Sequence, residues 1–148
     1  MFMDSILEFW DAQALTTQEE SRTNGDILDL EADGATNAQL GFLFWNLTVG
    51  TAAADLDSGG YFQLVTSDSA TFASGVEAVA AFGSARDPLA ASDLPAQAKF
   101  SAQVPLRVMK RYVEVEFVPV SEAASALVVN SWMGMEPVSP LNIQKEPT

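Results

Sequence analysis

The clearest strand pattern in the sequence is KRYVEVEFVPV, at Lys110–Val120. Its side chains alternate with a period of two, which places them on opposite faces of an extended chain. One face carries three apolar residues, Val113, Val115 and Phe117. The other face carries Tyr112, Glu114 and Glu116. The pattern therefore predicts a half-buried β-strand whose two glutamates are solvated.

The residues after this strand predict its partner. Pro119 ends the strand, because proline lacks the N–H that a central ladder requires. Ser121–Ser125 is a turn sequence, and the apolar run Ala126–Met133 follows it. We therefore expect the two apolar runs to pair as an antiparallel hairpin near the centre of a sheet.

Several other short segments have strand patterns and are separated by turn residues. They are Asp26–Leu30, Leu40–Val49, Tyr61–Ser67, Val76–Phe82 and Lys99–Val104. Val76–Phe82 also fits a helical turn, but it is short and flanked by glycines, which favours a strand. Residues 1–17 form either a first edge strand or a docking segment. Seven or eight short strands predict an all-β fold, an antiparallel jelly roll or two-sheet β-sandwich with extended terminal arms. We expect one jelly-roll domain at 1–136, including the N-terminal arm, and an extended Pro-rich tail at 137–148.

Leu40–Val49 is the most apolar of these segments. Its inward face is expected to hold Leu43, Trp45, Leu47 and Val49. Phe42 and Phe44 make the opposite face apolar as well, so that face needs a cover. The cover is either a second subunit, or the N-terminal arm or a loop of the same chain.

The composition excludes several kinds of chemistry. The chain has 148 residues, of which 48% are hydrophobic, and this is enough for the core of one domain. It contains no cysteine and no histidine, so it lacks disulfides, thiolate chemistry and the commonest general base and metal ligand. These absences weigh against a hydrolase or a zinc protein. The sequence shows no secretory or membrane segment, so we expect a soluble protein.

The net charge of −13 lies entirely in the first 98 residues, which hold fifteen acidic residues against Arg22 and Arg86. A negative field of this size repels nucleic acid and anionic lipid, so neither is an expected partner. Arg107, Lys110 and Arg111 form a small basic cluster that is a candidate contact for an acidic protein surface. The alternative is that these are solvated charges beside a strand.

Three other groups of residues suggest weaker functional candidates. Glu114 and Glu116 have a spacing near that of paired glycosidase carboxylates, but such pairs normally lie on different strands. Asp55–Gly60 begins like a calcium loop but lacks the closing glutamate. The aromatic residues suggest a sugar-stacking platform, although Trp45 is expected in the core. They are Trp10, Trp45, Tyr61, Tyr112 and Trp132. We therefore expect no catalytic residue, no cofactor and no metal site.

Four short motifs carry a resemblance to a known protein family. They are FWDAQA at Phe9–Ala14, DILDL at Asp26–Leu30, LVTSD at Leu64–Asp68 and KRY at Lys110–Tyr112. Over roughly residues 1–135, the chain resembles the small cement, or decoration, proteins of tailed phages, the family of the Bordetella phage cement protein. The resemblance implies a jelly-roll homodimer, without cofactor or catalytic residue, that ties neighbouring HK97-like major capsid protein subunits together.

On this interpretation the protein is made in the host cytoplasm and lies on the exterior of the icosahedral capsid in the virion. The residues expected at protein interfaces are Phe9, Trp10, Phe42, Phe44, Arg107, Lys110 and Arg111. The alternative function is a carbohydrate-binding β-sandwich module. A third and more distant alternative is a hydrolase that uses Glu114 and Glu116.

Overall fold

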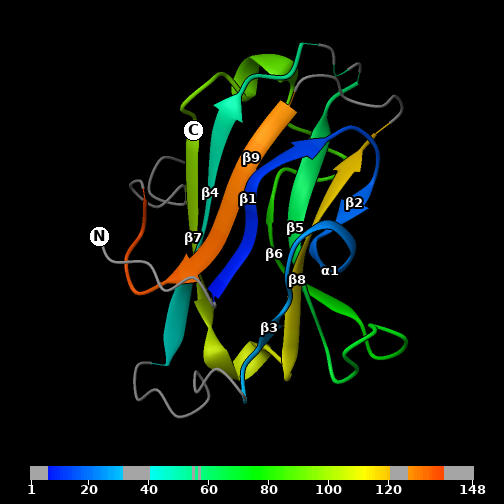
Figure 1. Cartoon of the computed structure of the whole chain (residues 1–148), viewed down its shortest axis with the longest axis vertical. Coiled ribbons are helices and arrows are strands. Elements are labelled where there is room, and N and C mark those ends of the chain that lie inside the picture. The colour runs from blue at the N-terminus through cyan, green and yellow to red at the C-terminus, as the bar shows by residue number, and fades with distance from the viewer. Residues whose placement is uncertain (1–6, 32–40, 55, 57, 121–126, 139–148) are drawn as a thin grey trace.

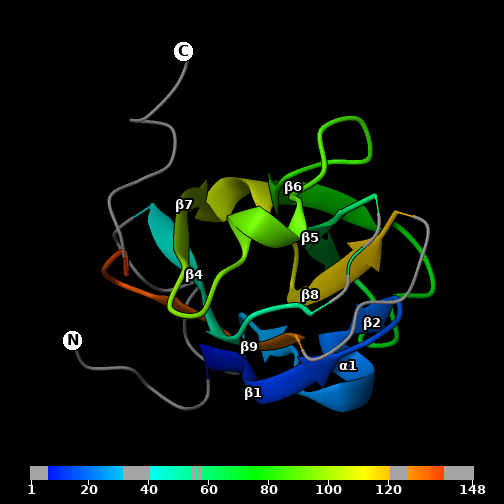
Figure 2. The same cartoon turned by 90° about the horizontal axis from the view of Figure 1, so that it is seen from above.

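The computed structural model describes residues 7–31, 41–54, 56, 58–120 and 127–138, and it consists of two antiparallel sheets packed face to face (Figures 1 and 2). Sheet A has the order β1 (Glu8–Leu15), β9 (Leu127–Gly134), β4 (Phe42–Thr51) and β7 (Lys99–Pro105). Sheet B has the order β2 (Glu19–Glu20), β8 (Tyr112–Pro119), β5 (Gly60–Ser67) and β6 (Glu77–Phe82). A further short strand, β3 (Leu28–Asp29), pairs with β8 beyond β2.

The helices of the described residues are short: α1 (Ser21–Asn24), η3 (Ala91–Asp93) and η4 (Leu106–Val108). None of them is long and apolar enough to cross a membrane.

The strand order is that of a jelly roll. The chain passes back and forth between the sheets, and β2 and β3 share one edge position along β8. Each sheet therefore has four strand positions, and the eight positions follow the two interleaved Greek keys of this fold. The predicted all-β fold class is confirmed.

The predicted hairpin between β8 and β9 is wrong. β8 pairs with β5, where Val115 lies opposite Leu64, whereas β9 pairs with β4, where Ser131 lies opposite Leu47. The sequence identified both strands correctly, β8 by its alternation and β9 as an apolar run, but neither pattern carries information about which strand is the partner. In a jelly roll, successive strands mostly enter different sheets, and here β5 and β6 are the pair adjacent in both sequence and sheet.

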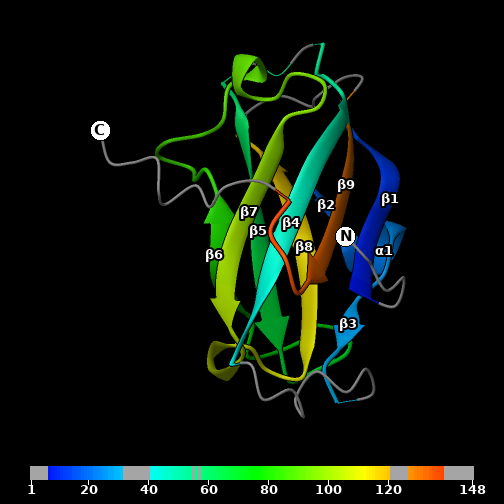
Figure 3. The same ribbon diagram turned by 90° about the vertical axis from the view of Figure 1, so that its left-hand side faces the viewer.

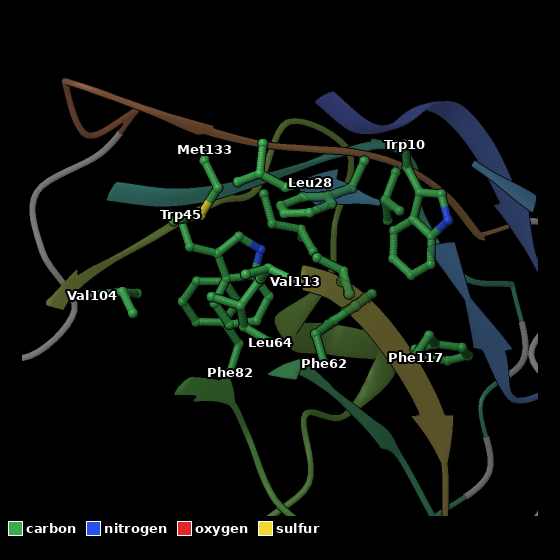
Figure 4. Close-up of a cluster of buried hydrophobic side chains, with 14 of the residues drawn as sticks. Trp10, Leu28, Trp45, Phe62, Leu64, Phe82, Val104, Val113, Phe117 and Met133 are labelled. Carbon is green, nitrogen blue, oxygen red and sulfur yellow. The ribbon is translucent and has the colours of Figure 1, made fainter. Parts of the chain in front are cut away.

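The inward faces of the sheets form one aromatic and aliphatic core (Figure 4). The predicted inward residues of β8 and β4 are all buried: Val113, Val115, Phe117, Leu43, Trp45, Leu47 and Val49. Trp45 of sheet A stacks on Phe82 of sheet B with 4.1 Å between ring centroids, and Phe62 lies 5.1 Å from Phe117. The first contact crosses between the layers and the second lies within sheet B. Burial of each such side chain is worth about 1.5–3 kcal/mol, so the packing of the two inward faces holds the layers together.

Within the N-terminal segment, Glu8–Leu15 is an edge strand, one of the two alternatives that the sequence left open, and residues 1–6 lie outside the described residues. Phe9 and Trp10 are each 1% exposed and belong to the core, so their predicted place at an interface with another protein is wrong. The indole N–H of Trp10 donates to Asn24 Oδ1 at 2.7 Å, and the N–H of Asp26 donates to the Phe9 carbonyl at 3.0 Å. β1 is therefore held by its ladder with β9 and by hydrogen bonds to Asn24 and Asp26, at the end of α1 and just after it.

Candidate functional site: the outer face of sheet A

The outer face of sheet A combines polar and apolar residues in neighbouring rows. In one row, Asn46 of β4 lies between Trp132 of β9 and Ser101 of β7. In the next row, Phe44 lies between Gly134 and Gln103. Side chains two residues apart on a strand share a face, so these rows line the same surface.

Asn46 and Ser101 bind the backbone of the segment that follows β9. Ser101 Oγ donates to Asn46 Oδ1 at 2.7 Å. The N–H of Val138 donates to Asn46 Oδ1 and to Ser101 Oγ, each at 2.9 Å, and Asn46 Nδ2 donates to the Glu136 carbonyl at 3.1 Å. We call Asn46 and Ser101 the backbone clamp, and Met135–Val138 the return segment. Figure 3 shows the return segment turning back across β4.

The return segment explains why polar outward residues are buried. Asn46 is fully buried and Ser101 is 1% exposed, although both lie on the face of sheet A that points away from the core. A buried amide needs hydrogen-bond partners, and the return segment supplies them. The cover over this part of β4 therefore comes from the C-terminal side of the chain, whereas β1 lies beside β9 at the edge of the sheet.

Phe42 and Phe44 remain half-buried beside the clamp. Their rings meet edge to face, with centroids 5.4 Å apart and an angle of 82° between the planes. Both side chains lie on the outer face, as predicted, and both keep exposed apolar surface. They form the apolar part of the candidate interaction surface.

Trp132 contributes a donor that is not used in the described part of the chain. The residue is 8% exposed, and its Nε1 has no hydrogen-bond partner there. An ideal Cβ at Gly134 would lie 3.7 Å from Trp132 Nε1 and 3.9 Å from Asn46 Nδ2. The two N–H groups therefore flank the same point on the surface, next to the clamp.

Two of the three predicted basic residues are already paired within the chain. Lys110 Nζ lies 2.8 Å from Glu77 and donates to the Gly75 carbonyl at 2.7 Å. Arg111 binds both carboxylate oxygens of Asp29, at 3.0 and 3.1 Å. Lys110 therefore stabilises the position of the start of β6, and Arg111 stabilises the position of β3. Arg107 of η4 is exposed, so it is the member of the cluster most open to another protein.

The predicted pair of solvated glutamates is wrong for Glu114. Its side chain is 0% exposed, and it accepts hydrogen bonds from the Arg22 N–H at 3.2 Å and from Arg22 Nη1 at 2.7 Å. Burial raises the pKa of Glu114 to about 7, against the lowering effect of Arg22. Glu116 instead accepts a hydrogen bond from Gln63 Nε2 at 2.7 Å. The two carboxylates therefore have separate structural partners.

Arg22 could not be found from the strand pattern, because it lies in α1, 92 positions away from Glu114. α1 covers the edge of β8 between β2 and β3, where Ser21 Oγ accepts a hydrogen bond from the Val115 N–H at 3.0 Å. The Ser21 hydroxyl thus accepts a hydrogen bond from the β8 backbone that the carbonyl of a continuous edge strand would accept.

The five aromatic residues of the suggested sugar platform do not share a surface. Trp10 and Trp45 are in the core, and Trp132 lies on the outer face of sheet A. Tyr61 and Tyr112 lie on the outer face of sheet B. In the calcium-like loop, Asp55 and Asp57 lie outside the described residues. Within the described ranges, no three Asp or Glu side chains gather in a way that could hold a metal ion.

Comparison with known proteins adds no relative to this description. No protein-family model matches the chain, and no curated protein sequence matches it. The function of the chain is therefore inferred from its fold and from the surface of sheet A.

Proposed function

We propose that this chain is a capsid cement, or decoration, protein of a tailed phage. In this role it binds the outer surface of the head and ties neighbouring HK97-like major capsid protein subunits together. The observation that carries the proposal is the half-buried pair Phe42–Phe44 on the outer face of sheet A, which keeps exposed apolar surface. Full burial of a phenylalanine side chain is worth about 1.5–3 kcal/mol, so a partner that covers the pair gains part of that energy.

The fold supports this proposal. The jelly roll is an architecture of viral capsid domains as well as of lectins and cupins. In this chain, stacked rings such as Trp45 and Phe82 fill the space between the sheets. An interior packed in this way leaves binding to the outer surfaces. The motif resemblance to phage cement proteins points to the same role.

The proposal includes a structural rather than an enzymatic role, a homodimeric state and a place on the exterior of the virion. The carbohydrate-binding alternative has less support, because the aromatic residues that would stack on sugars lie on different surfaces or in the core. Binding on a glycan array together with a failure to bind shells would reverse this preference.

Co-sedimentation with phage head shells tests the proposal. The double variant Phe42→Ser and Phe44→Ser is expected to stay folded but to remain in the supernatant. Val76 and Val120 are exposed valines away from sheet A, so the variant Val76→Ser with Val120→Ser is a matched control that should pellet with shells. Equal pelleting of both variants would remove the support for this surface.

A further inference from the structure

The backbone clamp recognises main-chain atoms of the return segment. Its partners are the Glu136 carbonyl and the Val138 N–H, which lie two residues apart. The segment bends at Met135, Glu136 and Val138, and these two groups both face the clamp. The Asn46 amide both donates and accepts, so it pairs with the segment as a peptide group would.

Three of the four side chains of the return segment contribute little to this contact, and the fourth, Val138, is half-buried. Met135 is 59% exposed, and Glu136 and Pro137 are also exposed. The segment is held by the hydrogen bonds of Asn46 and Ser101 rather than by a packed apolar face. The site therefore accepts a segment of the same bent conformation from another chain, provided that the residue in the position of Val138 has an N–H.

The intramolecular contact is also incomplete. Trp132 Nε1 is buried beside Asn46 and has no acceptor among the described residues. The return segment begins directly after Gly134, at the end of the strand that carries Trp132, so it must reverse direction within a few residues. A segment that arrives from a different molecule is free of this constraint and can place a carbonyl on the Trp132 donor.

We propose that the clamp and Trp132 form a peptide-binding site, and that in assemblies the site takes the return segment of a second copy of this chain. The segment of this chain is the occupant whose fit the structure displays. The half-buried Phe42 and Phe44 extend the same surface and give the body of the second copy an apolar contact. The inference does not depend on the capsid proposal, because neither test below contains a shell.

The first test uses the three indole N–H signals of the full-length variant Val138→Pro in NMR. Proline at this position removes the backbone N–H that the return segment donates to the clamp, and this frees the site. A peptide with the sequence of residues 134–140 is then added. The Trp132 signal is expected to shift, whereas the signals of Trp10 and Trp45 stay fixed, because their N–H groups are already bonded to Asn24 and Ser131.

Two controls make the peptide test specific. The same peptide with Val138→Pro should bind at least tenfold more weakly, and the peptide with Met135→Ala should bind unchanged, because Met135 is exposed. In the receptor, the additional change Ser101→Ala should weaken binding. If the Trp132 signal does not shift at millimolar peptide, the proposed peptide-binding site is wrong. It is also wrong if the native peptide and the peptide with Val138→Pro bind equally.

The second test asks whether copies exchange segments. Because the chain has no cysteine, single engineered thiols are unique. A chain with Gln103→Cys on β7 is mixed with a tagged chain with Pro137→Cys under mild oxidation. Exchange predicts a cross-link between the two variants that Asn46→Ala in the first chain abolishes. If the cross-link forms only within a chain that carries both substitutions, at every protein concentration, the exchange between copies is wrong.

Each copy carries a net charge of −13, so two copies repel one another at low ionic strength. The cross-link between copies should therefore increase as salt is raised from ~20 to ~200 mM, over which the screening length falls severalfold. A yield that decreases with salt would contradict an assembly that apolar contacts and backbone hydrogen bonds hold together.

Discussion

Glu114 Oε2 lies 2.7 Å from Arg22 Nη1, and this contact joins the middle of β8 to α1. The Glu114 side chain is 0% exposed, whereas Arg22 keeps 30% of its side chain in solvent. Arg22 also pairs with Glu20 at 2.6 Å and lies over the ring of Phe72. The outer face of sheet B is therefore organised around a buried carboxylate rather than around two solvated ones.

The raised pKa of Glu114 predicts that its contribution to stability decreases with pH. Because its pKa is 4.5 in the unfolded chain and about 7 in the folded one, the folded state binds the proton more tightly between these values. The free energy of unfolding should therefore fall as pH rises from about 4.5 to 7, and Glu114→Gln should flatten that part of the curve. Urea titrations at several pH values measure the difference.

Glu116→Gln is the matched control for this effect, since Glu116 is only half-buried and lies on the same strand face. It should leave the slope between pH 4.5 and 7 nearly unchanged. An identical flattening in both variants would mean that general charge repulsion, and not Glu114, sets the slope.

Gly25→Ala should strongly destabilise the fold, because a Cβ at Gly25 would overlap the Phe9 carbonyl oxygen and crowd the Trp10 ring. Displacing β1 to relieve that overlap is expected to cost about 2 kcal/mol or more. At Gly50, by contrast, a Cβ would meet its nearest atom, the Val128 carbonyl oxygen, at 3.6 Å. Gly50→Ala should therefore change stability by less than ~1 kcal/mol, and similar losses in the two variants would contradict this account.

Replacing tryptophan by phenylalanine should have opposite consequences at two positions. Trp10→Phe removes a hydrogen bond to Asn24 and is expected to cost about 1 kcal/mol. Trp132→Phe removes a buried N–H that has no partner in the described residues, so beyond the packing loss that both substitutions share it should cost nothing or gain up to ~1 kcal/mol. Thermal unfolding of the two variants distinguishes them, and a clear loss for Trp132→Phe would show that its N–H is satisfied in the free protein.

Deletion of residues 1–15 should abolish cooperative folding rather than free a docking arm. β1 contributes Phe9, Trp10 and Leu15 to the core, and each of them is at most 1% exposed. The loss of even one such side chain is worth about 3–5 kcal/mol when a large aromatic is removed. Circular dichroism and protease resistance of the shortened chain check this expectation, and a stable, cooperative fold without β1 would refute it.

The sequence predicted the strands well and their neighbours poorly. Alternation placed Val113, Val115 and Phe117 correctly in the core, because the period of two is a local property of the chain. The partner of β8 depends on contacts across the whole chain, and the apolar run that follows next in sequence belongs to the other sheet.

The polar residues were misjudged for a related reason. Glu114 and Ser101 have the positions of solvated side chains, but Arg22 and Val138 reach them from distant parts of the chain. No local spacing marks such partners. An asparagine in the middle of the most apolar strand was the available signal, since Asn46 is a residue that a buried backbone segment can satisfy.

The position of β9 between β1 and β4 also constrains when the protein can fold during its synthesis. β1 and β4 do not pair with each other, and both form ladders with β9. Sheet A therefore cannot be completed on the ribosome before residue 134 has emerged. Pairing over such long sequence separations slows folding. Until then β1 and β4 present open edges, and unpaired edges promote aggregation. Premature termination within β9 is therefore expected to yield aggregated rather than partly functional protein.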